Sequence, residues 1–445
     1  IVTGFYRPNL EMLITPCRSE QRNEQLLARL RERPVGSTIV YVTLQKTAEM
    51  VAQYLSNNGI SAMAYHAGLA SEERTQIQEW WMERTDGVVV ATIAFGMGID
   101  KHDVRYVYHW NMPKSLESYS QEIGRAGRDG KPSVVEMFAC DADLPVLENF
   151  IFGDTPDVAN IESLVRDILS RLDKFDVSMY DLSAQHDLRQ LVLKTALTYL
   201  ELDDAIQKGT PFYAEYEYKP TRSIDDVLNQ FSGAPGEFVA QLVRFSKRGT
   251  TWFKIDPEKA ANAFGCERRR VVRALEVLEE KGVIELRSAG IRDSYTRLRG
   301  LEAAEFLIES LSEKFQRREK GEVGRLQMVV DLVEHGGCQV NKLIGYFGEK
   351  RKKNCGHCSF CITKVTSRLA SGDGLPEISS AFSSEQVSGL RTRYPGLLNG
   401  ARPMARFLCG LTGPAFSKAR VMKDPLFGSM ANYRFEKVLE YVDQN

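Results

Sequence analysis

The chain has 445 residues, of which 43% are hydrophobic and 26% charged, and its formal net charge at pH 7 is −1. These values are ordinary for globular proteins, and the length exceeds what one hydrophobic core usually organises, so roughly two to four domains are expected. The near-zero charge excludes a uniformly basic nucleic-acid coat, and since no apolar run reaches membrane-spanning length, no membrane partner is expected.

Three short apolar segments rich in β-branched residues lie near the beginning of the chain: Thr38–Val42, Gly87–Ala91 and Arg105–His109. Helical patterns separate them, and this alternation is typical of βαβ units on a parallel sheet that is buried on both faces. Just past the second segment, Thr92 and the Gly96-Met97-Gly98 turn would lie at the carboxyl edge of that sheet, where open α/β sheets bind ligands. Glycines let backbone amides approach a phosphate, and a threonine hydroxyl can contact a nucleic-acid backbone.

Two arginines stand three residues apart in the run Gln121-Glu122-Ile123-Gly124-Arg125-Ala126-Gly127-Arg128-Asp129-Gly130. A guanidinium stays charged and grips phosphate oxygens bidentately, and an arginine finger raises the rate of phosphoryl transfer by roughly a thousand- to a hundred-thousand-fold. An isolated Arg-x-x-Arg is more often a basic helix start on a solvated face. The segments upstream favour the phosphoryl-transfer interpretation here.

Those segments are Tyr65-His66-Ala67-Gly68-Leu69 and the stretch from Ala91 to Lys101. Together with the arginine run, in this order and spacing, they resemble the motifs of the second motor domain of RecQ DNA helicases. The resemblance is close from about residue 5 to 150 and returns near residues 326–361. It implies ATP with Mg²⁺ as cofactor and DNA, both single-stranded and at duplex junctions, as partner.

The resemblance also implies roles for individual residues. The implied catalytic residues are Arg125 and Arg128; the nucleotide would be contacted by Gly98, Asp100, Gln121 and Gly124, and single-stranded DNA by His66 and Thr92. His66 precedes a glycine and could equally be a satisfied structural histidine.

The sequence lacks a Gly-x-x-x-x-Gly-Lys-Ser/Thr phosphate loop and an Asp-Glu-x-His metal box. Phe5-Tyr6-Arg7-Pro8-Asn9 resembles the family's junction between the first and second motor domains. We therefore expect a RecQ helicase whose first motor domain is absent, or the C-terminal part of a longer protein. Such a fragment carries half of an ATPase site and is expected to be inactive alone.

Eight cysteines give the second signal. Four are scattered in apolar contexts and are interpreted as ordinary buried thiols: Cys17, Cys140, Cys266 and Cys409. The other four are clustered: Cys338, Cys355, Cys358 and Cys361. Four soft ligands at this spacing suit tetrahedral zinc, with a disulfide or a redox Cys-x-x-Cys as the alternatives.

The cysteine region, with Leu343–Glu349 between the first cysteine and the other three, resembles the RecQ zinc-binding module. That resemblance implies structural Zn²⁺, because four protein thiolates leave no open position for chemistry. The adjacent basic run Lys350–Lys353 is either a DNA-backbone contact or a solvated charge run, and both interpretations stay open.

Between motor and cysteines, a helix is predicted over Asp256–Phe264, with Asp256 as N-cap and Pro257 at the first helical position. A second helix is predicted over Glu267–Lys281, and a wing over 283–298 with strands Val283–Leu286 and Tyr295–Leu298. Helix, turn, helix and hairpin is the winged-helix order. Four arginines of the second helix are candidate DNA contacts, with packing or protein contact as the alternative: Arg268, Arg269, Arg270 and Arg273.

The predicted architecture is an α/β RecA-like parallel-sheet domain followed by mostly α winged-helix and zinc-binding domains. The expected boundaries are a second motor domain (1–153), a helical linker region (154–245), a winged helix (246–300), a helical zinc-binding domain (301–366), a linker (367–386) and a basic helical C-terminal domain (387–445). A winged helix before the zinc module resembles the Rothmund–Thomson-type RecQ helicases.

The family resemblance predicts the C-terminal part of an ATP-dependent 3′–5′ DNA helicase acting in DNA repair and recombination. It would be cytoplasmic and nucleoid-associated in a bacterium, or nuclear in a eukaryote. A non-catalytic DNA-binding or scaffold protein is the alternative if no first motor domain precedes the chain. An RNA helicase of the wider superfamily is a weaker third interpretation, because a zinc module and a winged helix favour DNA.

Overall fold

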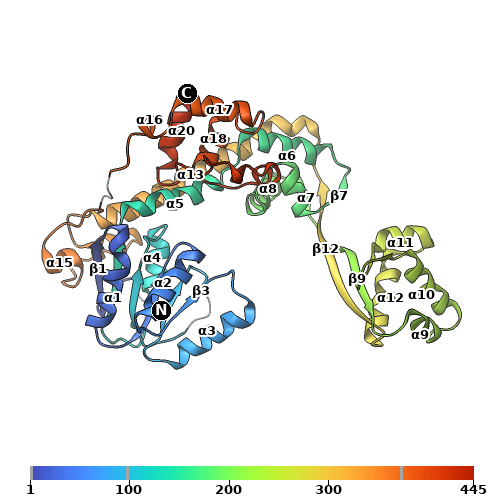
Figure 1. The fold of residues 1–445 in the computed structure, drawn as a ribbon, viewed down its shortest axis with the longest axis horizontal. Helices are drawn as coiled ribbons and strands as arrows, with labels where there is room; N and C mark the ends of the chain where they lie inside the picture. The colour runs from blue at the N-terminus through green and yellow to red at the C-terminus, as the bar shows by residue number, and fades with distance from the viewer. Residues whose placement is uncertain (1–3, 97–99, 371–373) are drawn as a thin grey trace. The chain divides into compact units, whose positions relative to one another are not determined.

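The structure, a computed structural model, describes residues 4–96, 100–370 and 374–445, and it is drawn in Figure 1. Gly98, expected at the nucleotide, lies outside the described residues. The chain forms two compact units: the first takes residues up to 155 together with 315–412 and 419–445, and the second takes 156–314 and 413–418. Among the described helices, none combines the length and the apolar character needed to cross a bilayer.

The first unit is built on a six-stranded parallel sheet of order β1-β6-β5-β2-β4-β3. Its strands are β1 (Leu10–Pro16), β2 (Ser37–Tyr41), β3 (Ala62–Tyr65), β4 (Val88–Ala91), β5 (Val104–His109) and β6 (Ser133–Ala139). Every residue of β2 and β4 is buried, as expected for central strands covered on both faces. The three strands predicted from the sequence match β2, β4 and β5 to within one residue at each end.

Helices cover both faces of this sheet. They are α1 (Arg22–Glu32), α2 (Gln45–Asn57), α3 (Ser71–Glu83), α4 (Leu116–Ile123) and α5 (Leu144–Gly153). One core cluster holds Leu26 of α1 and Val51 of α2, while the other holds Trp81 of α3 and Tyr119 of α4. The second cluster contains the residues that position the candidate site.

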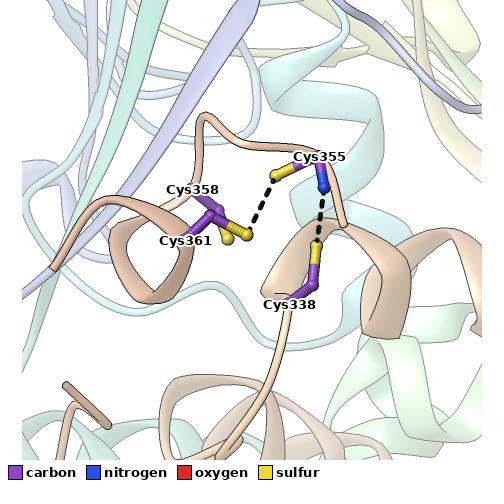
Figure 2. A group of neighbouring side chains, drawn as sticks. All are labelled: Cys338, Cys355, Cys358 and Cys361. Atoms are coloured by element: carbon purple, nitrogen blue, oxygen red, sulfur yellow. Dashed lines mark hydrogen bonds between the residues drawn. The ribbon is translucent and has the colours of Figure 1, made fainter. Parts of the chain in front are cut away.

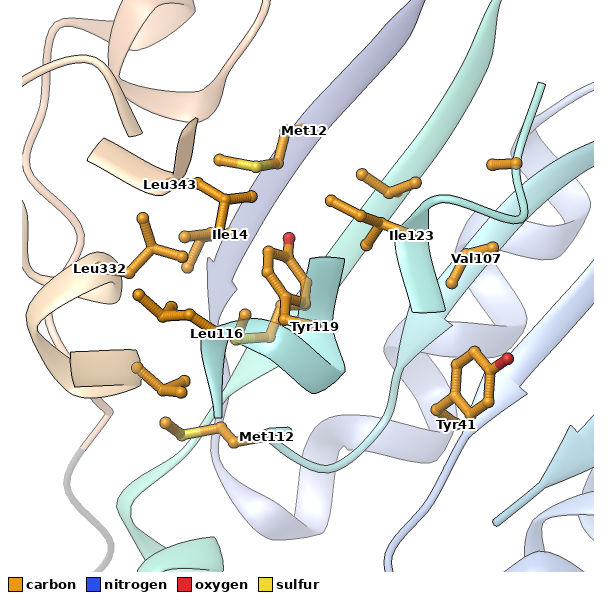
Figure 3. Packing of buried hydrophobic residues seen from close by; sticks show 14 of the residues in the cluster. Met12, Ile14, Tyr41, Val107, Met112, Leu116, Tyr119, Ile123, Leu332 and Leu343 are labelled. Atoms are coloured by element: carbon orange, nitrogen blue, oxygen red, sulfur yellow. The ribbon is translucent and has the colours of Figure 1, made fainter. Parts of the chain in front are cut away.

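Residues 301–366, which were expected to form the zinc-binding domain and which we call the zinc region, contribute to that second core. The helices of this region are α13 (Ala304–Val333), α14 (Gln339–Tyr346) and α15 (Ser359–Thr363). Figure 3 shows Met12 and Ile14 of β1 beside Leu332 and Leu343, which belong to α13 and α14. The outer edge of β1 is also capped, because the Met12 amide donates to the His357 carbonyl at 3.0 Å. The zinc region is therefore packed onto the motor sheet.

Helix α13 is 30 residues long. A 3₁₀ turn occupies Leu301–Ala303, and α13 then runs without interruption to Val333. The basic residues after Gln316 do not end the helix, because apolar residues recur at helical spacing beyond them; Leu326, Val329 and Val333 are all buried.

The second unit mixes helices and antiparallel strands. Its helices are α6 (Val158–Ser170), α7 (Met179–Gln185), α8 (Gln190–Leu202), α9 (Ile224–Asn229), α10 (Gly233–Phe245), α11 (Pro257–Phe264) and α12 (Arg268–Glu280). Its strands are β7 (Lys174–Val177), β8 (Ile206–Lys208), β9 (Phe212–Pro220), β10 (Lys247–Arg248), β11 (Phe253–Ile255) and β12 (Ile284–Arg297). The region 154–245, expected to be a helical linker, also contains three of these strands: β7, β8 and β9.

The helix-turn-helix prediction is confirmed. Asp256 caps α11 by accepting hydrogen bonds from the Glu258 and Lys259 amides, each at 3.1 Å. Gly265 ends the helix in the left-handed conformation at φ 63°, which costs glycine little. Helices α11 and α12 contribute to the same hydrophobic core, in which Leu275 of α12 is fully buried.

The predicted wing hairpin is wrong. The segment 284–297 is one fourteen-residue strand, β12, and its middle pairs with β9 where the turn was expected. The pairing partner lies upstream of α11, at Phe212–Pro220, in a stretch whose polar and aromatic residues alternate. Because β9 supplies the hydrogen-bonding partner, β12 can remain extended and does not have to form a hairpin.

The C-terminal segment of the first unit is helical, as expected for 387–445. Its helices are α16 (Ile378–Ala381), α17 (Ser384–Arg393), α18 (Ala401–Leu408) and α20 (Phe435–Gln444); α19 (Pro414–Ala419) lies mostly in the second unit. The expected linker 367–386 contains α16 and the start of α17. Ser383 and Gln386 form a capping box at the N-terminus of α17.

Candidate functional site

The arginine run forms the end of α4 and the turn after it. Ser115 caps the start of α4 by accepting from the Ser118 amide at 3.2 Å, and the helix ends at Ile123. Gly127 takes φ 57°, and its amide donates to the Val104 carbonyl at 2.9 Å, which fixes the turn against β5. We call residues 124–131 the arginine turn.

The two arginines differ in their surroundings. The Arg125 Nη1 atom donates to the Gly96 carbonyl at 2.6 Å, so this side chain holds the loop that follows β4. The Arg128 Nη1 atom lies 2.8 Å from Asp100 Oδ1, and the side chains are 34% and 71% exposed. A guanidinium paired with so exposed an acid can exchange it for a phosphate at little cost.

Gln121 and Gly124 line a cavity of about 320 Å³, together with Phe5, Arg7 and Phe347 among others. Gln121 is exposed on α4, one turn before Arg125. A Cβ at Gly124 would lie 3.0 Å from the Ser120 carbonyl oxygen, so the helix end leaves little room for a side chain. Gly124 is thus the first residue of the arginine turn, and Gln121 precedes the turn on α4.

Sequence reasoning missed the residues that support this turn from the N-terminal side. Arg7 Nη2 donates to the carbonyls of Ala126 at 3.1 Å and Gly127 at 2.8 Å. Asn9 Nδ2 donates to the carbonyls of Gly127 at 2.8 Å and Lys131 at 3.0 Å. Burial, and secondly the nearby Arg128 charge, lower the pKa of Arg7. Only the resemblance of Phe5–Asn9 to a domain junction drew attention to this stretch.

His66 and Thr92 lie at the ends of neighbouring strands, because Tyr65 and Ala91 are paired between β3 and β4. His66 is 3% exposed and its Nε2 lies 3.2 Å from Glu49 Oε1. Thr92 is 9% exposed, and its amide donates to the Tyr65 carbonyl. The burial of His66 fits the structural alternative.

A cavity of about 350 Å³ lies at the carboxyl ends of β2 and β5. Its polar lining includes Thr43, Asn111 and a buried pair in which His109 Nε2 lies 2.8 Å from Glu122 Oε2. Sequence reasoning did not single out these residues, because each stands alone without a recognisable spacing.

The four clustered cysteines converge, as Figure 2 shows. Their Sγ atoms all lie within 4.8 Å of one another. Cys338 precedes α14 and Cys358 precedes α15, so two helix starts and the loop between them supply the thiols. His357 is turned away: its Nε2 lies 3.2 Å from the Tyr6 hydroxyl.

Backbone amides donate hydrogen bonds to two of the four sulfurs. The Cys355 amide donates to Cys338 Sγ at 3.3 Å, and the His357 amide donates to Cys355 Sγ at 3.4 Å. A hydrogen bond from Cys355 lowers the pKa of the Cys358 thiol, whereas the same hydrogen bond raises the pKa of Cys355 and burial raises that of Cys361. Four converging sulfurs with amide donors fit a tetrahedral zinc ion and leave no open coordination position. The zinc prediction is supported, and its role is structural.

The arginines of α12 differ in the contacts that they make within the protein. Arg268 Nη2 donates to the Tyr213 carbonyl at 2.6 Å, and the Arg270 guanidinium lies 4.7 Å from the centre of the Phe238 ring. Arg273 pairs with Glu280 at 2.9 Å and with Glu276. Arg269 is exposed on the helix surface. The helix therefore does not present four equivalent cations.

Two family descriptions match the chain. "Helicase conserved C-terminal domain" matches residues 21–130, and "RecQ zinc-binding" matches residues 299–362. The first range covers most of the motor sheet and the arginine turn up to Gly130, and the second covers α13 and all four clustered cysteines.

Relatives with helicase names are similar to part of the chain. ATP-dependent DNA helicase Q5 of Rattus norvegicus is 54% identical over 103 residues, which is 23% of this chain and 11% of the relative. ATP-dependent DNA helicase RecQ of Pasteurella multocida is 41% identical over 150 residues, 34% of this chain and 23% of the relative. The chain thus spans about a tenth to a quarter of the length of these relatives.

Among solved structures, the chain is similar to the E. coli DEAD-box protein SrmB bound to the regulator of ribonuclease activity A. The identity is 25%, the match covers 29% of this chain and 76% of that one, and the TM-score is 0.27. A TM-score of this size supports no assignment of its own.

Proposed function

The chain belongs to the RecQ family of DNA helicases, whose C-terminal region it carries, and on that premise we propose that it completes the nucleotide site of an ATP-dependent 3′–5′ helicase. The observation that carries the proposal is the arginine turn. Arg128 stands on a braced backbone, its side chain is 34% exposed, and it is paired with the exposed carboxylate of Asp100. A first motor domain would supply the phosphate loop and Mg²⁺, and Arg128 would reach across to the γ-phosphate of ATP.

Arg125 and Arg128 have separate tasks in this proposal. Arg128 stabilises the charge that develops on the transferring phosphoryl group. Arg125 holds the Gly96 carbonyl and so keeps the loop after β4 in contact with the turn. Asp100 holds Arg128 while no nucleotide is bound, and Gln121 senses the same site from α4. Together these contacts link the loop that starts at Thr92, a candidate DNA contact, to the nucleotide.

DNA would be held in two ways. Single-stranded DNA would run along the carboxyl edge of the sheet past Thr92, where hydroxyl and backbone groups contact phosphates without reading sequence. The basic run Lys350–Lys353 and the α12 arginines would contact duplex backbone. Zinc would hold the platform that presents the basic run. Such an enzyme would serve DNA repair or recombination.

An unwinding assay tests this function. The full-length enzyme should separate a duplex with a 3′ single-stranded tail in the presence of ATP and Mg²⁺, and it should leave a 5′-tailed duplex largely intact. Preference for the 5′ tail contradicts the polarity, and preference for a tailed RNA duplex contradicts the substrate. DNA binding without ATP turnover would instead identify a non-catalytic scaffold.

A further inference from the structure

The stretch Phe5–Asn9 lies between the zinc region and the arginine turn and contacts both. Toward the turn, Arg7 and Asn9 donate four hydrogen bonds to the carbonyls of Ala126, Gly127 and Lys131. These residues are about 120 positions away in the sequence, at separations of 118 to 122. The backbone that carries Arg128 is therefore fixed by a distant segment.

Toward the zinc region, the same stretch is held by four further contacts. The Phe5 ring stacks on Phe347 at a centroid distance of 4.3 Å, and Glu349 Oε2 accepts the Phe5 and Tyr6 amides at 2.5 and 3.1 Å. The Arg351 guanidinium lies 3.3 Å from the centre of the Tyr6 ring.

The Tyr6 hydroxyl also lies 3.2 Å from Nε2 of His357, the residue between two of the clustered cysteines. Phe5 and Tyr6 are thus tied to the zinc region immediately before Arg7 reaches the turn.

We propose that Arg7 is a positioning residue for Arg128, and that Phe5–Asn9 forms a bracket through which the zinc region fixes the arginine turn. The proposal rests on the proposed function of Arg128 as the finger. Arg7 is a cation, as Arg128 is, so it cannot form an ion pair with Arg128; it acts through the two carbonyls immediately before Arg128.

The chemistry of the contact explains why an arginine suits this position. One planar guanidinium places donors toward two successive carbonyls, whereas a lysine ammonium would have to choose between less well aligned positions. Ala126 and Gly127 are buried, so loss of Arg7 costs the Ala126 carbonyl a donor, while the Gly127 carbonyl keeps Asn9 Nδ2 and the Gly130 amide. The turn would then shift, and a displacement of about 1 Å at a catalytic group can cost roughly a hundredfold in rate.

A double-mutant cycle in the full-length enzyme tests the proposal. Arg7→Ala should lower kcat for DNA-stimulated ATP hydrolysis by about ten- to a hundredfold, with KM for ATP and Kd for DNA nearly unchanged. Arg7→Lys should restore part of the lost rate. In an Arg128→Ala background, Arg7→Ala should lower kcat by less than about twofold, because the group that it positions is gone.

Two further variants separate positioning from general destabilisation. Arg31→Ala is the matched control, since Arg31 also donates to a backbone carbonyl, that of Asn58, but far along the sequence from the turn. It should leave kcat unchanged. Glu349→Ala should lower kcat in the same direction as Arg7→Ala while the zinc content stays constant, because Glu349 holds the bracket without ligating metal.

The outcomes are distinguishable. If Arg128→Ala keeps normal turnover, the proposed finger is wrong. If Arg128→Ala abolishes turnover but Arg7→Ala leaves kcat intact, or if the two losses multiply in full, the finger stands and the bracket is overturned. An equal loss of kcat in Arg31→Ala would also overturn it.

Discussion

The zinc cluster and the arginine turn lie in the same unit, yet they hold their functional groups by different means. The cluster draws its four thiols from residues 338–361, and a bound zinc ion would tie them together. The turn, whose residues the structure describes in full, has no metal site: Gly127 is held by hydrogen bonds to Arg7, Asn9 and Val104. One site would be closed around an ion, whereas the other is held in place by protein backbone and side chains.

The two sites should therefore respond differently to perturbation: the cluster should be lost as a whole, whereas the turn should be displaced by degrees. Removal of a shared ion removes every tie at once, so the cluster should fail cooperatively. The turn has several independent hydrogen bonds, each worth about 1 kcal/mol, so single changes should displace it by degrees. The function proposed for the turn would be sensitive to such displacement, because phosphoryl transfer depends on the position of the charge.

Metal removal should give the largest effect. Elemental analysis should find about one zinc ion per chain, and Cys358→Ser should lose on the order of 10 kcal/mol of local folding free energy. Hydrogen exchange should then show α14 and α15 unprotected, and the protein should become poorly soluble. Cys266→Ser is the control, because this half-exposed thiol lies outside the cluster. A folded, metal-free protein, or a Cys355–Cys361 disulfide, would show that the cluster does not hold zinc.

A pair of glycine variants should give the next largest effect. Gly127→Ala and Gly130→Ala both place a Cβ on a residue with positive φ, at 57° and 78°, which costs about 1–2 kcal/mol each. Only at Gly127 would that Cβ meet Asn9 Nδ2, at 2.5 Å, whereas nothing lies within 4 Å at Gly130. Denaturant unfolding should therefore show a greater loss for Gly127→Ala, accompanied by a lower ATP turnover. Equal losses of stability and turnover would mean that the packing of Asn9 on the turn is unimportant.

The α12 arginines should give the smallest effect, measured as the slope of log affinity against log salt. Replacing all four by Ala would flatten the slope by about three to four units if each neutralised a phosphate. The structure sharpens this expectation. Arg269→Ala with Arg270→Ala should account for about two units, whereas Arg268→Ala should change the slope less, because its guanidinium already donates to the Tyr213 carbonyl.

Arg273→Ala is the comparison variant within the same helix, since Arg273 is paired with Glu280 and Glu276. A change below about one unit for the double variant would mean that α12 faces protein rather than DNA.

The parallel sheet was predictable because fully buried strands have a distinct pattern, as in β2 and β4. The caps of α11 were predictable for a similar reason: Asp256, Pro257 and Gly265 each have a local conformational preference. The wing was not, because the partner of β12 is β9, which lies about 70 residues upstream of it, with Ile284 paired to Pro220. Strand pairing between distant segments leaves no local signature.

The candidate site likewise has features that could be predicted from the sequence and features that could not. The four candidate zinc ligands could be predicted from their clustering: Cys355, Cys358 and Cys361 lie on one short loop and helix start, and Cys338 precedes α14. Arg128 could be predicted as a candidate from its motif, but the residues that surround it could not. Nothing near Arg7 in the sequence indicates that its guanidinium reaches Gly127, because that contact exists only once β1 and β6 are paired in the sheet.

The most direct measurement is ATP turnover by the full-length enzyme carrying Arg128→Ala, at saturating DNA. The account predicts that kcat falls by about a thousandfold or more while Kd for single-stranded DNA stays nearly unchanged, because Arg128 contacts nucleotide rather than DNA. Arg31→Ala measured beside it should keep normal turnover. Near-normal turnover by Arg128→Ala, or a loss that is matched by an equal loss of DNA affinity, would contradict the assignment of Arg128 as the arginine finger.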